Sequence, residues 1–574
     1  MCLGDDSDAP LVGCGNIIGS VLLSRRTALT LLPAAAAARP QAPDNYVGGL
    51  VIENDKAVES YIERQNVDPA SRWRGAVPDQ FGLHEPGSAS GLLLRGVASY
   101  VRSESRFHGG AELRTRIKLA AEHLERVQTP DGNVDLLVTN FNSPPDTGFV
   151  MLNVGVAASL ARKHGEDEIF GWMEPFVRRA GEGLVKGGIH TPNHRWVVCA
   201  ALALTHRLFP DPAYVRRIDQ WLAEGIDIGP DGQYSERSTT VYNAITNNAL
   251  IMVADLLDRP GLLGPVRQNL EAMLYLLHPN YEVVTEISRR QDRNTTGDMG
   301  RYWFGLRYLA RKDGNGGYET LTRAFEPSHA SLGQYLDFPT LQANGPAPKP
   351  VPSSYERLLP ASNLVRIRRG KTSATLVLEG SSRFFALRRG DAVINGVRFA
   401  AAFFGKGQFT PTRGEKRDGA YRMEQTLEGP YFQPHDPPRK QPWGGDEWHE
   451  LRAGREQTEV SRIRYIAEVR ERTNGFDLRI KTEGTANVPL AVEINLRDGG
   501  EIEGVTQTSS GDQAYLLSQG YALYRLGGDS IRFGPGLAET EYTQVRGAEP
   551  KLQGPSVYLT TFTPVDRVIE FRWG

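Results

Sequence analysis

The spacing of apolar residues along the chain changes once, near residue 340. From about residue 50 to residue 335 the apolar positions recur every three to four residues, which is typical of amphipathic helices. Examples of segments with this spacing are Leu92–Val101, Leu113–Val127, Val150–Leu160, Phe170–Leu184, Val197–Leu208, Tyr214–Leu222, Val241–Leu257, Val266–Leu277 and Tyr302–Leu309. The N-terminal half is therefore predicted to be helical.

Short polar connections separate these helices. They carry Gly, Pro, Asp or Asn, as in Thr129–Gly132, Pro210–Pro212 and Asp258–Gly261, and such residues end helices and form turns. Many consecutive helices joined in this way pack as antiparallel hairpins in a toroid or a solenoid. Because no tight sequence repeat supports a solenoid, we expect an (α/α) toroid, an incomplete barrel, over residues 43–340.

A proline-rich stretch, Ala343–Ser353, then interrupts the helical pattern, and we assign residues 341–356 to a linker. Beyond it, apolar and polar residues alternate with a period of two, which predicts strands. The alternating segments are Leu364–Arg368, Ser373–Leu378, Phe384–Leu387, Leu478–Ile480, Leu490–Ile494, Val557–Phe562 and Val568–Trp573. The expected fold is α+β multidomain, with an antiparallel β-sandwich or stacked sheets over residues 357–574.

The first residues have the features of an export signal. Ser24–Leu32 joins paired arginines to a short apolar run, and Ala34–Ala38 supplies the small residues of a cleavage region, as in a bacterial twin-arginine signal. We expect residues 1–42 to be a leader and the mature protein to be periplasmic or secreted. No later window offers the roughly twenty apolar residues of a membrane span, so no membrane partner is expected.

Composition narrows the classes of partner. The chain has 574 residues with 66 basic and 68 acidic side chains, a formal charge of −2, so no overall positive field favours nucleic acid. An anionic substrate must be held by local groups. Cys199 is the one cysteine outside the leader, which predicts an inert buried thiol and no disulfide in the mature protein.

The most informative motif opens the helix that contains Val197–Leu208. Thr191 is a good N-cap and Pro192 suits the first helical position, so Asn193 and His194 fall in the first turn. Unpaired backbone N–H groups and the positive end of the helix dipole lie there, and they favour an anionic ligand. A histidine at such a place is expected to stay neutral and able to accept a proton.

A second polar segment, Asp231–Glu236, follows about forty residues later and leads to Tyr242. Glu236 is either a general acid or an ion-pair partner of Arg237. Arginine suits carboxylate recognition through its fork of N–H groups. The candidates for this role are Arg237, Arg289, Arg290 and Arg293.

A helical toroid followed by an antiparallel β domain, with Asn-His opening an inner helix and Asp-Gly-x-Tyr-Ser-Glu leading to a further Tyr, resembles the heparinase II/III-like and alginate-lyase-like polysaccharide lyases. The resemblance implies catalytic roles for Asn193, His194 and either Tyr242 or Tyr234. It also implies β-elimination on a uronic-acid-containing glycan, which leaves a 4,5-unsaturated uronate. The uronate carboxylate must be neutralised before its C5 proton can be removed, and Asn193 would donate to it.

Further residues are candidates for binding sugars or a metal ion. Trp73, His84 and Asn142 suit sugar subsites. His190 and His194 are four residues apart, but Pro192 starts the helix between them, which argues against a metal pair. No cofactor is required; a structural zinc or calcium ion would suit His435, Asp446 and His449 of the β domain.

Two other functions stay open from the sequence. A glycoside hydrolase on the same toroid would use two carboxylates; the candidates are Asp146, Asp231, Glu236, Glu286 and Asp298. A noncatalytic carbohydrate-binding protein would show affinity without turnover. Ultraviolet absorbance of the unsaturated product distinguishes lysis from both.

Overall fold

The structure is a computed structural model, and it describes residues 46–326, 329–440, 452, 454–509, 511 and 513–573. The expected leader, with Ser24–Leu32, lies outside the described residues, as do Asp446 and His449. The chain forms two compact units. The first runs to Leu274 and resumes over Ser288–Val351, and the second combines Tyr275–Ile287 with Pro352 onward.

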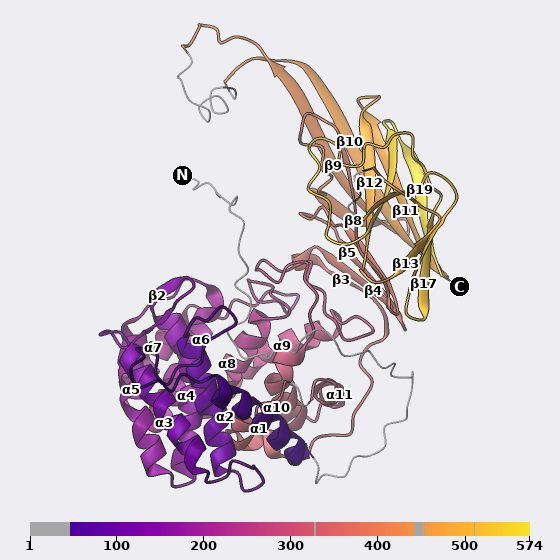
Figure 1. The fold of residues 1–574 in the computed structure, drawn as a ribbon. Coiled ribbons are helices and arrows are strands. Elements are labelled where there is room, and N and C mark those ends of the chain that lie inside the picture. The colour runs from indigo at the N-terminus through magenta and orange to yellow at the C-terminus, as the bar shows by residue number, and fades with distance from the viewer. Residues whose placement is uncertain are drawn as a thin grey trace. The chain divides into compact units, whose positions relative to one another are not determined.

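The first unit is helical, in agreement with the apolar spacing (Figure 1). The helices of its described part are α1 (Tyr46–Arg64), α2 (Pro86–Val101), α3 (Ala111–Val127), α4 (Pro144–Lys163), α5 (Asp167–Lys186), α6 (Pro192–Leu208), α7 (Pro212–Ala223), α8 (Tyr242–Leu256), α9 (Leu263–Leu274), α10 (Trp303–Asp313), α11 (Gly316–Ala324) and α12 (Leu332–Asp337). A short hairpin, β1 (Val134–Leu136) and β2 (Asn140–Ser143), precedes α4.

These helices form two rows. Helices α2, α4, α6, α8 and α10 contact one another in succession, and α3, α5 and α7 form a second row that packs against them. The row that contains α6 is the more buried, and Trp196 and Trp303 in it are among the largest fully buried side chains. This arrangement confirms the predicted helical toroid, with α6 in its inner row. None of the described helices is long and apolar enough to cross a membrane.

The second unit consists of two packed sheets. The strands are β3 (Ser354–Leu359), β4 (Leu364–Arg369), β5 (Thr372–Val377), β6 (Phe385–Arg389), β7 (Ala392–Ala401), β8 (Arg413–Arg417), β9 (Ala420–Phe432), β10 (Gln457–Arg472), β11 (Gly475–Gly484), β12 (Pro489–Leu496), β13 (Glu501–Glu503), β14 (Thr506–Gln507), β15 (Ala514–Leu516), β16 (Ala522–Leu526), β17 (Asp529–Gly534), β18 (Ser556–Phe562) and β19 (Asp566–Arg572). One sheet has the order β13-β16-β17-β19-β11-β10-β9-β8, and the other has the order β14-β15-β18-β12-β7-β6-β5-β4-β3.

The core of this unit lies between the sheets. Side chains such as Phe385, Phe399 and Tyr465 come from both of them and form a continuous apolar cluster. The expectation of antiparallel pairing holds for the other strand pairs of the described residues, whereas β15 pairs with β18 in parallel. The chain between these two strands passes through β16 and β17 of the other sheet before it returns, and parallel pairing needs a crossover of this kind.

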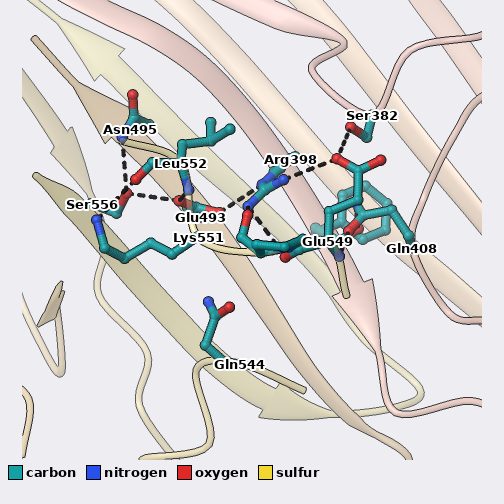
Figure 2. Close-up of polar contacts among 12 residues, drawn as sticks. Ser382, Arg398, Gln408, Glu493, Asn495, Gln544, Glu549, Lys551, Leu552 and Ser556 are labelled. Carbon is teal, nitrogen blue, oxygen red and sulfur yellow. Dashed lines mark hydrogen bonds and ion pairs between the residues drawn. The ribbon is translucent and has the colours of Figure 1, made fainter. Parts of the chain in front are cut away.

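A buried polar network holds the segment before β18 on the sheet (Figure 2). Arg398 and Glu493 face each other on β7 and β12, with the Arg398 Nε atom 2.6 Å from Glu493 Oε2. Arg398 also donates to Glu549 Oε2 at 3.0 Å and to the Pro550 carbonyl. The other oxygen of Glu493 accepts from the Leu552 N–H and the Ser556 hydroxyl.

The segment Tyr275–Ile287 lies in the second unit, whereas the sequence pattern carried a helix through Leu277. Helix α9 ends at Leu274, and Leu277 then forms a β-bridge with Val283. Glu282 accepts from both Arg497 and Arg388, and these two arginines hold the pKa of its carboxyl near 2. Contacts with residues more than a hundred positions later therefore decide where this segment packs.

Candidate active site

The start of α6 is already occupied by an anion from the chain itself. Thr191 is the N-cap residue, but its side chain does not accept from a backbone N–H of the helix. Instead, Glu236 Oε2 accepts from the Asn193 backbone N–H at 3.2 Å and from the Asn193 side-chain amide at 2.8 Å. The predicted cap is therefore replaced by a carboxylate 43 residues away, which satisfies the charge preference of the helix start.

Asn193 is consequently a positioning residue. Its side chain is 1% exposed, and its Nδ2 atom donates to Thr191 Oγ1 as well as to Glu236. Its Oδ1 atom is buried and has no hydrogen-bond partner in the described structure. In this arrangement both amide hydrogens of Asn193 are used within the protein.

His194 lies beside Asn193 in a dry environment. Burial, with the nearby charges of His190 and Arg290, lowers the pKa of its imidazole to about 3. The ring centroid is 4.7 Å from that of His190 and 6.0 Å from that of Phe149, and both contacts are edge-on. The rings of His190 and His194 are therefore in contact although α6 starts between them, at Pro192. His194 is neutral at ordinary pH, as the sequence predicted.

The structure distinguishes the two candidate tyrosines. Tyr234 is 3% exposed, and its hydroxyl donates to Asn247 Oδ1 at 2.8 Å. Asn247 in turn donates to Asn269, so Tyr234 belongs to an interior network. Burial raises its pKa well above the usual value. Tyr242 is half-buried, and its hydroxyl accepts from Gln291 Nε2 at 2.7 Å near the surface. Tyr242 is the tyrosine that a substrate can reach.

A line of contacts joins Tyr242 to the start of α6. The Arg290 guanidinium lies over the Tyr242 ring, 4.9 Å from its centroid. The Nε atom of Arg290 is 3.4 Å from Glu236 Oε1, and Glu236 bonds to Asn193. Tyr242, Arg290 and the start of α6 therefore lie on the same side of the toroid. We call this set the α6 cluster: Tyr242, Arg290, Glu236, Asn193 and His194.

Glu236 is the acidic member of this cluster. Burial raises the pKa of its carboxyl, whereas the Asn193 hydrogen bonds and the Arg290 charge act in the opposite direction. Its Oε1 atom and the Arg290 Nε atom are both buried, and neither makes a hydrogen bond in the described structure. The contact is an ion pair without hydrogen bonds, and it leaves donor capacity on Arg290 unused.

Asp292, which sequence reasoning missed, fixes the segment that carries the arginines. It is 5% exposed, and its Oδ2 atom accepts from Ser238 Oγ, the Thr240 backbone N–H and Thr240 Oγ1. These bonds attach the loop of Arg290 to the residues just before Tyr242. The only sequence signal was its position inside the run Arg289–Arg293.

Of the other predicted arginines, Arg289 and Arg293 lie in the same loop as Arg290. Arg289 donates to the Ser235 carbonyl, and its own N–H bonds to the Glu236 carbonyl. Arg293 lies in the turn that Arg290 begins. Arg237 has a positive φ of 49°, and burial together with Arg289 lowers its pKa. Sequence reasoning also missed Arg301. Burial lowers the pKa of its guanidinium, and Tyr242 lies near enough to interact with it electrostatically.

Two of the three expected sugar-binding residues, Trp73 and His84, contact each other. Trp73 stacks on His84, with ring centroids 5.1 Å apart and an angle of 2° between the planes. Burial lowers the pKa of His84. Asn142 instead holds a turn, since its amide donates to Asp131 and its carbonyl accepts from Thr129 and Asn133. In the described residues, no hydrogen bond or ring contact joins Trp73 or His84 to His194 or Tyr242.

Two further predictions from the sequence concern the Cys199 thiol and a metal site. Burial raises the pKa of the Cys199 thiol to about 12, as expected of an inert thiol. Among the residues that the structure describes, no three His, Cys, Asp or Glu side chains come together as metal ligands. The structural ion of the β domain stays a prediction, because Asp446 and His449 lie outside the described ranges.

No protein-family model matches the chain, and no curated protein matches it. Solved structures do match. The chondroitin AC lyase of Streptomyces coelicolor A3, solved in complex with chondroitin sulphate, has 14% identity, and the match covers 94% of this chain and 81% of that one with a TM-score of 0.56. A xanthan lyase of Paenibacillus has 10% identity over 92% of this chain and 56% of its own, with a TM-score of 0.54. This protein therefore has the fold of these lyases, a helical toroid followed by stacked β-sheets.

Proposed function

We propose that this protein is a polysaccharide lyase that cleaves a uronic-acid-containing glycan by β-elimination and leaves a 4,5-unsaturated uronate. The observation that carries the proposal is the α6 cluster, in which a neutral histidine and a reachable tyrosine are joined through Arg290 and Glu236. The fold shared with two lyases supports the same reaction class. The paired arginines of Ser24–Leu32 support export by the twin-arginine route.

The substrate carboxylate is bound by the arginine loop in this proposal. Asn193 is occupied by Glu236, so the donors must come from elsewhere. The Arg290 side chain is 30% exposed, and Arg289 has one neutral carbonyl as its side-chain partner in the described structure. A guanidinium that binds the carboxylate withdraws charge from it, and this makes the neighbouring C5 proton more acidic.

Elimination then moves two protons. His194 takes the C5 proton, the electrons of that bond form the C4–C5 double bond, and the bond from C4 to the leaving oxygen breaks. Tyr242 gives its hydroxyl proton to that oxygen, and the Arg290 guanidinium over its ring stabilises the tyrosinate. Return of the proton from His194 to Tyr242 restores both groups.

The low pKa of His194 means that this residue must become a stronger base when the substrate is bound. An imidazole with a pKa of about 3 is a weak base. A uronate carboxylate bound next to it supplies the opposite charge, which favours the protonated form and raises that pKa. The base is therefore strengthened by the substrate, and the free enzyme keeps His194 neutral.

The test is a product assay on the full chain. Alginate, glucuronan, heparinoids, pectic chains and rhamnose-glucuronate side chains of arabinogalactan are incubated with the wild type and with Tyr242→Phe. We expect ultraviolet-absorbing product from at least one glycan with the wild type, and a loss of that product with the variant. New reducing ends without absorbance would identify a hydrolase instead, and binding without either product would identify a carbohydrate-binding protein.

A further inference from the structure

A cavity lies at one end of the β-sandwich, and none of the residues assigned to catalysis lines it. Its volume is about 140 Å³, well above the roughly 10–15 Å³ that a cavity needs to hold one water molecule. Three turns line it: the β4–β5 turn with Arg369 and Thr372, the end of β6 with Arg389, and the β10–β11 turn with Glu471 and Arg472.

The lining is cationic. Arg369 pairs with Glu471 at 2.8 Å, and Arg472 pairs with Asp477 at 2.5 Å. Arg389 is different, because its contacts in the described structure are the Thr372 hydroxyl at 3.0 Å and an indole ring, and neither carries a charge. The Arg389 guanidinium thus keeps N–H donors for an anion inside the cavity.

The same cavity has an aromatic wall. The Trp573 ring is half-buried and packs against Phe476, with ring centroids 6.1 Å apart. The guanidinium of Arg389 lies 5.6 Å from the Trp573 ring centroid. Buried Phe476 and Ile367 line the cavity beside them. An indole surface suits the C–H face of a sugar, and an adjacent guanidinium suits its carboxylate.

We propose that this cavity is a second glycan subsite that binds one uronate ring, with the carboxylate on Arg389 and the ring face on Trp573. The choice of a uronate rests on the proposed function, because a carboxylate and an apolar ring face occur together in that sugar. The site binds the glycan and takes no part in bond cleavage. It would hold the polymer at a second point and raise the effective concentration of chain at the catalytic unit.

The test measures binding of a single ring to the full chain. Methyl glucuronide is the probe, methyl glucoside is its neutral counterpart, and the dissociation constant comes from ligand-observed saturation-transfer NMR. The background is Arg290→Gln, which weakens binding at the α6 cluster. We expect Arg389→Gln to weaken methyl glucuronide binding by about tenfold in that background. Arg389→Lys keeps the charge without the fork of N–H groups. Its affinity for methyl glucuronide should lie between that of the background protein and that of Arg389→Gln.

Arg417→Gln is the matched control, since Arg417 is an exposed arginine on β8 whose partner is the exposed Asp418. It should leave binding unchanged, and a melting curve for each variant checks the fold. Equal affinity with and without Arg389, or equal affinity for methyl glucoside, would overturn the subsite. These outcomes are independent of the product assay, because binding is measured whether or not any glycan is cleaved.

Discussion

Two arginine–glutamate contacts, one in each unit, have opposite characters. In the β-sandwich, Arg398 and Glu493 are 2.6 Å apart, and both are nearly completely buried. In the helical unit, Arg290 and Glu236 are 3.4 Å apart, and the Arg290 side chain is 30% exposed. The residue types are the same. The difference lies in how many of their donors and acceptors are used.

The Arg398 network uses its polar atoms internally. Glu493 accepts from Arg398, Leu552 and Ser556, and Arg398 reaches two further acceptors, Glu549 and Pro550. A buried network with this many bonds holds a single conformation. It fixes the segment before β18.

The α6 cluster leaves polar atoms unused. In the described structure, Asn193 Oδ1, His194 Nδ1, Glu236 Oε1 and Arg290 Nε are buried without hydrogen-bond partners. Unsatisfied buried groups cost free energy and are rare in folded proteins, so a group of four calls for a reason. A substrate that supplies the missing partners is such a reason. The contrast agrees with a structural role for the first network and with the catalytic role proposed for the second.

The largest expected effect is on turnover. Tyr242→Phe removes the hydroxyl that supplies the proton to the leaving group, and loss of such a group slows the chemical step by about 10²–10⁴-fold. The rate of ultraviolet-absorbing product measures it. The melting temperature should stay within about 1 °C of the wild type, because the lost bond is a surface contact with Gln291. A variant with wild-type turnover would remove Tyr242 from the mechanism.

The next prediction compares the two arginines directly. Arg398→Gln leaves Glu493 buried without its cation and should lower the free energy of unfolding of the β unit by about 3–5 kcal/mol. Arg290→Gln breaks a partly exposed pair and should cost less than about 1 kcal/mol, while it slows product formation. Urea unfolding and product rates measure the two effects. Equal stability losses would contradict the contrast between the networks.

Tyr234→Phe should lower stability and leave chemistry intact. The substitution removes the donor to Asn247 Oδ1 in an interior network, and an unsatisfied buried acceptor costs about 1–3 kcal/mol. The product rate at low temperature should match the wild type. Together with Tyr242→Phe, this forms a matched pair: one tyrosine affects the rate and the other affects the unfolding midpoint. A large rate loss in Tyr234→Phe would reopen the choice between them.

The sequence predicted the elements with strong local patterns. Helix α6 begins at Pro192, as the motif indicated, and the long apolar segments are helices. Helices α1, α11 and α12 lie almost entirely within the range predicted to be helical, although none of them was named as a separate segment. The parallel pairing of β15 with β18 was missed. Strand β15 has three residues, and its partner is chosen by the path of the chain through the other sheet.

The site was predictable in its residues and less so in its bonds. Asn193, His194, Tyr242, Glu236 and Arg290 were all named as candidates, from the helix start, from the polar residue types and from the resemblance to the lyases. The bond between Glu236 and Asn193 spans 43 positions, and no local rule assigns it. The rule that Thr191 caps its own helix was therefore wrong. Asp292 and Gln291 were missed because their importance comes from what they contact.

The smallest effect is expected at Glu236. Its pKa is raised by burial, so the folded state binds the proton more tightly than the unfolded state does. Stability from this group is fully present below the unfolded pKa, near 4.5, and is lost as pH rises through the folded pKa. Glu236→Gln removes this titration but keeps an acceptor for Asn193, so the stability change should be below about 1 kcal/mol.

The direction in which pH changes the stability of Glu236→Gln tests how Glu236 is held. Relative to the wild type, Glu236→Gln should gain stability as pH rises from 4.5 toward 8, because the variant has no buried carboxyl to ionise. Melting temperatures of both proteins across this range measure the trend. A growing disadvantage of the variant at higher pH would mean that the ionised Glu236 is held by Arg290 and Asn193 as firmly as Glu493 is held by Arg398. The difference between the two networks would then disappear.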